Sequence, residues 1–281
     1  MPSFRSTLAD GSTAAAAAPA SGVTAAGAAE AGGDLQRRDS AVLLVNTGTP
    51  AAPRSGAVRR FLGRFLSDRR VIELPRVLWL PLLHCLVLPL RSPRSAHRYR
   101  LIWRSEGSPL LVYTSQLRAA LAQEPALTQA AVRVEQAFLY SAPSVAETME
   151  TLRAAGVRRL LVLPLFPQAS GTTTGAVYDQ VAQALTRWRT LPELRYCAEY
   201  YDDADYISAL ADSVREHWRE HGHDGHLLLS FHGIPQAYVQ RGDRYADQCR
   251  ETAARLAAAL GLAPQDWSLS FQSRFGANRW L

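Results

Sequence analysis

One histidine, at the end of an apolar run, is the first candidate for a residue that acts on a bound ligand. His232 follows the apolar run His226–Phe231 and directly precedes Gly233. An imidazole can accept a proton near neutral pH, or bind a divalent cation through its unprotonated nitrogen. In open α/β sheets, ligands collect beyond the carboxyl ends of the strands. His232 is therefore a candidate for proton transfer or metal binding, and a purely structural histidine in a turn is the alternative that this pattern leaves open.

Three other expected strand ends carry polar side chains. They are Asn46–Pro50, Tyr140 and Gln168–Thr174. Proline and glycine lie near these ends and are expected to hold the turns rigid. No expected strand is followed by Gly-x-Gly-x-x-Gly, the fingerprint of a dinucleotide site. We therefore expect a ligand other than NAD at this edge of the sheet.

A histidine-rich stretch resembles a metal site at first sight. Its members are His217, His221, His223 and His226. Two of them are four residues apart and would share a helix face, as zinc ligands do. No accompanying carboxylate pattern is evident, and the stretch spans a helix end and two glycines. A solvated helix terminus, whose dipole favours histidine, explains it better.

The cysteine pattern and the basic residues exclude several classes of protein. Cys85, Cys197 and Cys249 are far apart and form no Cys-x-x-Cys pair, so neither a zinc finger nor an iron–sulfur cluster is expected. Such sparse thiols are typical of a reducing compartment. All 31 basic residues are arginine, against 25 acidic residues. Without lysine, a Walker-type phosphate loop, a pyridoxal-phosphate Schiff base and a kinase site are impossible.

The expected strands and helices that must position these residues alternate along the chain. Hydrophobic residues make up 47% of the 281 residues and charged residues 20%, which is typical of a globular protein. Apolar runs predict strands at 41–45, 132–139, 159–165, 194–199, 226–231 and 267–271. Helices are expected at 55–66, from 143, and at 175–189, 203–221 and 243–260. This alternation predicts parallel sheets covered by helices on both faces, with a domain boundary near 222–225.

The segment Leu74–Leu90 is the apolar outlier of the chain. It is too short to span a bilayer, and prolines interrupt it. Residues 54–104 around it hold 12 arginines against Asp68 and Glu73. An apolar segment rimmed by arginine can rest on an anionic membrane or line the mouth of a cavity for an apolar anion. A core helix with solvated arginine neighbours is the alternative. Nucleic acid is not expected, because no recognition motif accompanies the basic residues.

Residues 1–38 form an extension of low complexity, rich in alanine and glycine. A signal peptide would need a leucine-rich core, and a mitochondrial transit segment would need several arginines; both fit poorly. We expect a disordered extension or a start codon assigned too early.

Seven stretches of the chain together resemble the ferrochelatase family, of the proteobacterial type. They occur in the family's order and extend over more than 80% of the chain. They are Leu43–Pro50, Phe65–Val71, Leu88–Pro93, Gly107–Thr114, Leu163–Gln168, Leu229–Pro235 and Ser270–Gly276. No single stretch would be specific, but their combination is.

The resemblance implies a fold and an activity. The implied fold is α/β, with two Rossmann-like domains at 39–224 and 225–281, parallel sheets and a porphyrin cleft between the domains. The implied reaction is the insertion of ferrous iron into protoporphyrin IX, the last step of haem synthesis. The segment 74–93 would be the active-site lip that meets the membrane. The implied location is the cytoplasm, with peripheral contact to an anionic inner-membrane surface.

The resemblance also implies roles for particular residues. His232 would be the catalytic histidine, as ligand of the metal or acceptor of the pyrrole protons. Thr47 and Tyr140 would contact the macrocycle, while the propionates would be held by Arg91, Tyr99 and Ser108. Porphyrin and ferrous iron would be the partners, and no cofactor beyond that iron, and no iron–sulfur cluster, is expected.

The chain departs from the family pattern at its C-terminus. Family members continue well beyond the Ser270–Gly276 stretch, with a glutamate that faces the histidine and the remaining strands of the second domain. The chain is therefore expected to hold an incomplete second domain of marginal stability. The alternative to a working enzyme is a chain that only binds porphyrin or the membrane surface. A Rossmann oxidoreductase is disfavoured by the absent glycine fingerprint.

Overall fold

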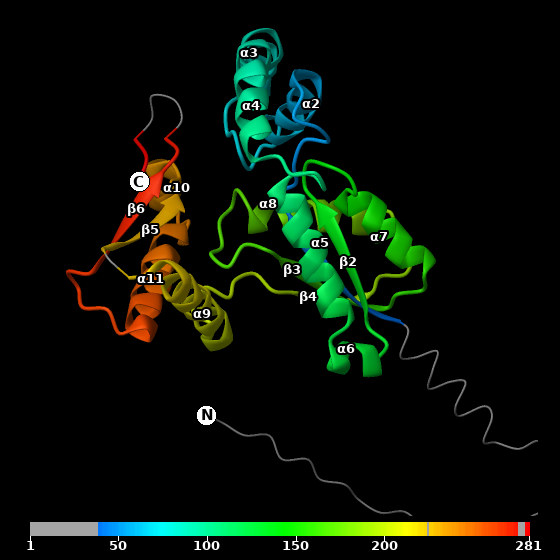
Figure 1. The fold of residues 1–281 in the computed structure, drawn as a ribbon. Helices are drawn as coiled ribbons and strands as arrows, with labels where there is room; N and C mark the ends of the chain where they lie inside the picture. The colour runs from blue at the N-terminus through cyan, green and yellow to red at the C-terminus, as the bar shows by residue number, and fades with distance from the viewer. Residues whose placement is uncertain (1–38, 224, 275–278) are drawn as a thin grey trace, which may run out of the picture. The chain divides into compact units, whose positions relative to one another are not determined.

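The computed structural model describes residues 39–223, 225–274 and 279–281, all within one compact unit, 37–281 (Figure 1). The extension expected to be disordered, 1–38, lies outside the described residues, as does part of the final loop, 275–278. The expected α/β fold with parallel sheets is confirmed, because the strands form two sheets in which every pairing is parallel.

The first sheet has four strands in the order β2-β1-β3-β4. They are β1 (Ser40–Asn46), β2 (Arg133–Phe138), β3 (Arg159–Pro164) and β4 (Glu193–Tyr196). The central strand β1 is the most buried, with Leu43, Leu44 and Val45 fully covered. A parallel sheet needs cover on both faces, so its inner strands β1 and β3 are continuous apolar runs, and this is why the sequence located them closely.

Besides the apolar segment described below, five helices connect these strands along the chain. They are α2 (Ser55–Leu66), α5 (Pro109–Ala122), α6 (Pro125–Gln129), α7 (Val145–Ala154) and α8 (Thr174–Leu185). α5 packs along β2, and α7 packs against both β2 and α8. Side chains fix two of the helix starts. Ser108 caps α5, and Ser144 forms a reciprocal capping box with Glu147 at α7.

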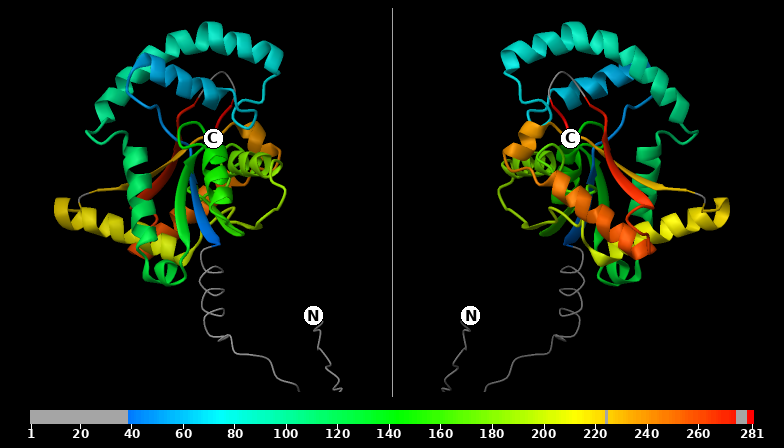
Figure 2. Two further views of the ribbon diagram at one scale, coloured as in Figure 1. Left: turned by 90° about the vertical axis from the view of Figure 1, so that its right-hand side faces the viewer. Right: turned by 90° about the vertical axis from the view of Figure 1, so that its left-hand side faces the viewer.

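The apolar segment noted in the sequence begins a long, bent helical path (Figure 2). It consists of α3 (Arg76–Leu82), a π-helical turn η1 (Leu83–Val87) and α4 (Leu88–Ile102). The π turn inserts one extra residue, so the buried row steps by five positions there and by four elsewhere. That row is Trp79, Leu83, Leu88, Ser92 and Ala96. Among the described residues, no helix is both long enough and apolar enough to cross a membrane.

The second sheet pairs β5 (Leu227–His232) with β6 (Trp267–Gln272). Three helices accompany these strands: α9 (Ala204–His221), α10 (Gln236–Gln240) and α11 (Tyr245–Leu260). α11 packs on β6 and on α9. Side chains of β5 alternate between half-buried and exposed, and Leu228 is 58% exposed. One face of this sheet therefore carries little cover in the described part of the chain.

Candidate active site

His232 is the last residue of β5 and is exposed. Its Nδ1 lies 2.7 Å from the carbonyl oxygen of Gly233. A carbonyl oxygen can only accept a hydrogen bond, so Nδ1 must carry the proton in this contact. In the neutral form of the ring, the lone pair is then on Nε2. That nitrogen can accept a proton or bind a metal ion, which is the chemistry expected for His232 from the sequence.

The backbone around His232 is closely packed. The amide of Gly233 donates to the carbonyl of Gln272 at 2.7 Å, and a Cβ on Gly233 would lie 3.1 Å from that same oxygen. The ring of Trp280 covers Gly233 and lies 6.3 Å from the His232 ring. The indole N–H of Trp280 is buried without a hydrogen-bond partner in the described structure. A glycine at 233 therefore lets the turn after β5 approach β6 and Trp280.

The carboxyl ends of β1 and β2 meet, as the sequence predicts. The amide of Tyr140 donates to the carbonyl of Thr47 at 3.1 Å. The Tyr140 phenol is buried and donates to Asp68 at 2.8 Å. Burial, followed by the charge of Asp68, raises the pKa of Tyr140. In the described part of the chain, neither residue forms a hydrogen bond or a ring contact with His232.

The three residues expected to hold propionates lie on or beside α4 and α5. Arg91 is exposed on α4, and partial burial together with the nearby charge of Arg98 lowers its pKa. Tyr99 is half-buried with its ring edge against Trp103, and burial raises its pKa. Ser108 is 2% exposed, and its hydroxyl oxygen accepts from the Leu111 amide at 3.3 Å. Ser108 therefore has a structural role as a helix cap. Its contact with a propionate stays a prediction.

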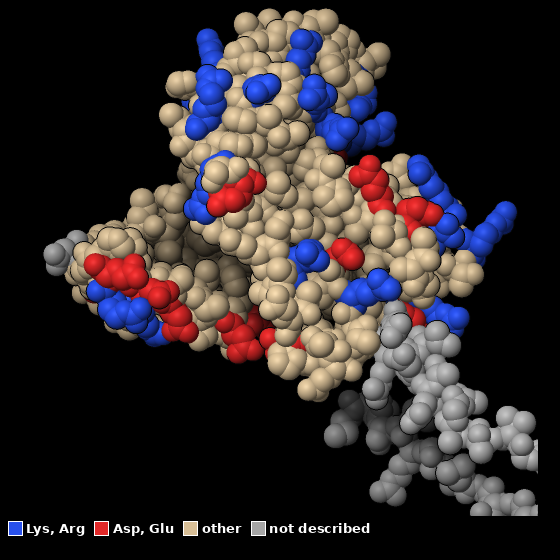
Figure 3. Space-filling view, turned by 45° about the vertical axis from the view of Figure 1, so that its right-hand side comes forward, with Lys and Arg blue, Asp and Glu red and all other residues tan. Residues whose placement is uncertain are grey.

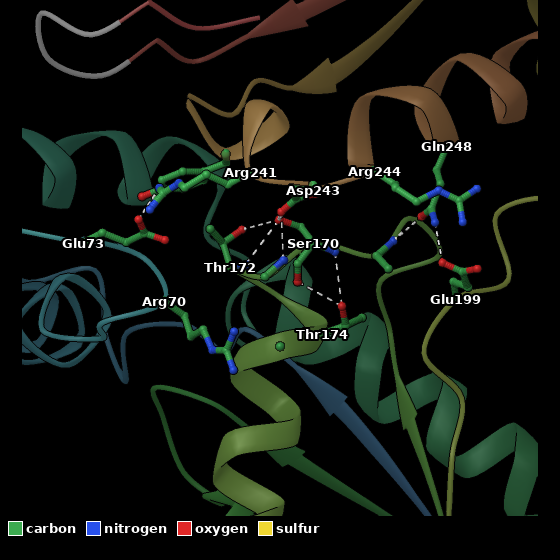
Figure 4. A pocket seen from close by; sticks show the side chains of 15 residues that line it. Arg70, Glu73, Ser170, Thr172, Thr174, Glu199, Arg241, Asp243, Arg244 and Gln248 are labelled. Atoms are coloured by element: carbon green, nitrogen blue, oxygen red, sulfur yellow. Dashed lines mark hydrogen bonds and ion pairs between the residues drawn. The ribbon is translucent and has the colours of Figure 1, made fainter. Parts of the chain in front are cut away.

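A cavity of about 490 Å³, lined mostly by residues of polar and charged type, lies at the carboxyl end of β3, on the loop 168–174 and the start of α11 (Figure 4). Asp243 occupies its centre. One carboxylate oxygen of Asp243 accepts from the hydroxyl of Ser170 at 2.8 Å and from the amide of Gly171 at 3.0 Å. Gln248, from α11, accepts from the amide of Ala169 at 2.6 Å. His232 does not line this cavity, so the cavity is not the space beside the imidazole.

The remaining candidate metal ligands are dispersed. His217 and His221 stack on the exposed end of α9, and the His221 ring bonds the His217 carbonyl, as expected for a helix terminus. Cys249 is buried, which raises its pKa to about 12. In the described residues, no three His, Cys, Asp or Glu side chains gather closely enough to hold a metal ion.

The sequence reasoning missed Asp68, Asp243 and Tyr245. Asp68 lies in the stretch Phe65–Val71, but its partner Tyr140 is 72 positions away in the chain. Asp243 was missed because its partner Ser170 is 73 positions away in the chain. A local signal did exist: Asp243 directly follows Gly242 at the start of the expected helix, where an aspartate commonly accepts hydrogen bonds from the backbone.

Comparison with known proteins identifies one family. A model of the ferrochelatase family matches residues 39–281. The chain is 51% identical over 242 residues to a ferrochelatase of Aeromonas hydrophila, covering 86% of this chain and 75% of that protein. It is 50% identical to a ferrochelatase of Azoarcus sp., covering 86% of this chain and 66% of the relative. A ferrochelatase of Escherichia coli is 47% identical over 247 residues, covering 88% of this chain and 76% of that protein.

Proposed function

The chain belongs to the ferrochelatase family, and we propose that His232 serves that family's reaction, the insertion of ferrous iron into protoporphyrin IX in haem synthesis. The observation that carries this role is the Nδ1 contact with the Gly233 carbonyl. It fixes one neutral tautomer and leaves Nε2 free at an exposed strand end. Either role expected for His232, proton acceptor or metal ligand, needs this free lone pair.

The proton balance of the reaction explains the need for such a base. Two pyrrole N–H protons must leave the macrocycle before iron can bind its four nitrogens. A neutral imidazole within reach of the ring centre can take up a proton and pass it to water. Bending the macrocycle exposes the nitrogen lone pairs, and contacts with the rest of the porphyrin must supply that strain.

The porphyrin itself would be held by two kinds of surface. It is a flat apolar disc with two carboxylates at one edge, so it needs an apolar wall and donors at the rim. We assign the wall contacts to Thr47 and Tyr140 and the propionate contacts to Arg91, Tyr99 and Ser108. Arg91 suits a carboxylate because its fork can hold both oxygens. We propose no cofactor besides the ferrous substrate and no iron–sulfur cluster, which metal and sulfide analysis of the purified protein can check.

Insertion of zinc or ferrous iron into protoporphyrin, followed by absorbance, tests the function. The comparison is between the full chain, His232→Ala and the matched variant His217→Ala, which removes an exposed histidine at the end of α9. We expect turnover by the chain and by His217→Ala, and a loss of at least about 100-fold in His232→Ala. Porphyrin binding without turnover by the folded chain would favour the alternative, a protein that binds porphyrin only. Equal turnover in all three would contradict the role of His232.

We further propose that the lip rests on an anionic membrane surface, which would place the protein in the cytoplasm with peripheral contact to the inner membrane. The exposed apolar side chains of this stretch recur every four residues, at Leu74, Leu78, Leu82, Leu86 and Leu90, with Val77 beside them. A spacing of four drifts around an ideal α-helix, whereas the wider π turn rotates the other way. The turn at Leu83–Val87 therefore helps to keep the stripe on one face. Arginines rim these helices at the top of Figure 3.

A further inference from the structure

Asp243 connects two segments that lie far apart in the sequence. Its Oδ2 accepts from Ser170 and Gly171, in the loop that follows β3. Its Oδ1 accepts from the amide of Tyr245 at 3.0 Å, at the first residue of α11. Hydrogen bonds to a carboxylate are stronger than those between neutral groups. The loop at the edge of the first sheet is therefore tied to the start of α11.

Tyr245 continues this connection toward the imidazole. Its phenol lies next to the main chain of His232 and the side chain of Cys249. Tyr245 is half-buried, and burial is the main cause that raises its pKa, so the phenol stays protonated at neutral pH. Three successive contacts thus run from the loop 168–174 through Asp243 and Tyr245 to the backbone of His232.

We propose that Asp243 is a positioning residue for His232. It anchors the segment after β5 to the loop at the carboxyl end of β3 and, through Tyr245, holds the backbone of His232 at a fixed place relative to the first sheet. Thr47 and Tyr140 lie at the same edge of that sheet, because parallel strands end together. Asp243 thereby fixes the distance between the imidazole and the residues assigned to the porphyrin.

The rate of catalysis depends on the distance between the reacting groups, so a positioning residue affects the rate. A displacement of about 1 Å at a reacting group can cost about 100-fold in rate. His232 is exposed, and in the described residues its ring forms one hydrogen bond, to the adjacent Gly233. Its position therefore depends on how its backbone is held. The inference rests on the proposed function for its effect on rate, but the position of the ring can be measured without turnover.

Three variants remove successive links of the connection while keeping side-chain size. Asp243→Asn replaces one accepting oxygen by a donor, Ser170→Ala removes a donor on the loop, and Tyr245→Phe removes the hydroxyl beside His232. The matched control is Asp247→Asn, in the first turn of the same helix, where the aspartate is exposed and forms an ion pair with Arg250. Ser170→Ala and Tyr245→Phe keep the test decisive if Asp243→Asn fails to fold.

Two readouts are needed. The first is the ring resonance of His232 in protein with ¹³C-labelled histidine, assigned with His232→Ala. The second is kcat and porphyrin KM for zinc insertion. We expect the His232 resonance to shift or broaden in the three variants, and kcat to fall about tenfold or more with KM little changed. Asp247→Asn should match the wild type in both.

Two results would overturn the proposal. One is a His232 resonance and a kcat that match the wild type in all three variants. The other is a lower melting temperature with both readouts unchanged, which would make Asp243 a residue of stability only. If the wild-type chain shows no turnover, the proposed function fails, and the His232 resonance alone decides whether Asp243 positions the ring.

Discussion

The Tyr140 hydroxyl donates its hydrogen bond to Asp68, so any contact with a porphyrin is left to the ring. The hydroxyl is buried, and a hydrogen bond to a charged group contributes about 1.5 to 3 kcal/mol. We expect Tyr140→Phe to lower the free energy of unfolding by about 2 kcal/mol at pH 7 in urea titrations. Tyr178→Phe, which changes an exposed tyrosine on α8, is the control and should leave it unchanged.

The phenol of Tyr140 also predicts that the stability of the folded protein depends on pH in the alkaline range. The pKa of Tyr140 is raised in the folded state, so as pH rises above 10.0, the ordinary value, the unfolded chain loses this proton first. Stability linked to Tyr140 is therefore fully present below pH 10 and is lost above it. The wild type should lose stability above pH 10 more steeply than Tyr140→Phe. Parallel losses in urea titrations at pH 7, 10 and 11 would contradict this assignment.

At the scale of elements, the sequence predicted the strands well and the bent helical path poorly. β1, β3 and β5 are apolar runs that end near a glycine or a proline, and the structure keeps strands at these local signals. The stretch 76–102 was not resolved into α3, η1 and α4, because its prolines favour interruption while tertiary packing of Trp79 and Leu83 keeps the path helical. The apolar run before His232 was enough to predict that this residue lies at a strand end. The role of Asp243 depends on a contact between distant segments of the chain, which the local sequence does not show.

The exposed stripe of the lip predicts binding to vesicles. Leu78 is 73% exposed, so Leu78→Asn should leave the melting temperature unchanged. Burial of one leucine side chain in lipid stabilises the bound state by about 1.5 kcal/mol or more. Partition of the Leu78→Asn variant onto phosphatidylglycerol vesicles should therefore be about tenfold weaker than that of the wild type. Leu191→Asn, at another exposed leucine outside the lip, is the control.

Salt separates the two contributions to this binding. Arginine attraction to anionic lipid is screened as ionic strength rises, whereas apolar burial is not. Binding of the wild type should therefore weaken in high salt and on neutral vesicles in sedimentation assays. Equal binding of both leucine variants would show that the lip does not carry the contact.

At the scale of the whole molecule, the loop 168–174 meets α11 through a buried polar seam. Gln168, Ser170 and Thr174 on one side, and Gln248 and Thr252 on the other, are all buried. The Gln168 amide donates to Thr252 at 3.0 Å, and Gln248 also contacts Glu199. Such a seam depends on every hydrogen bond being satisfied, because an unpaired buried group costs about 1 to 3 kcal/mol.

Gln248→Ala should loosen the second sheet more than the first. The variant leaves the Ala169 amide without its acceptor, which costs about 2 kcal/mol. The small two-stranded sheet of β5 and β6 depends on α11, so we expect it to open as a unit. Amide exchange of Leu229 and Phe231 should accelerate roughly 30-fold, while that of Leu43 and Val45 changes little. Gln240→Ala, at the exposed end of α10, is the control. Equal acceleration in both sheets would mean that the seam stabilises the whole fold at once and that the second sheet has no independent opening.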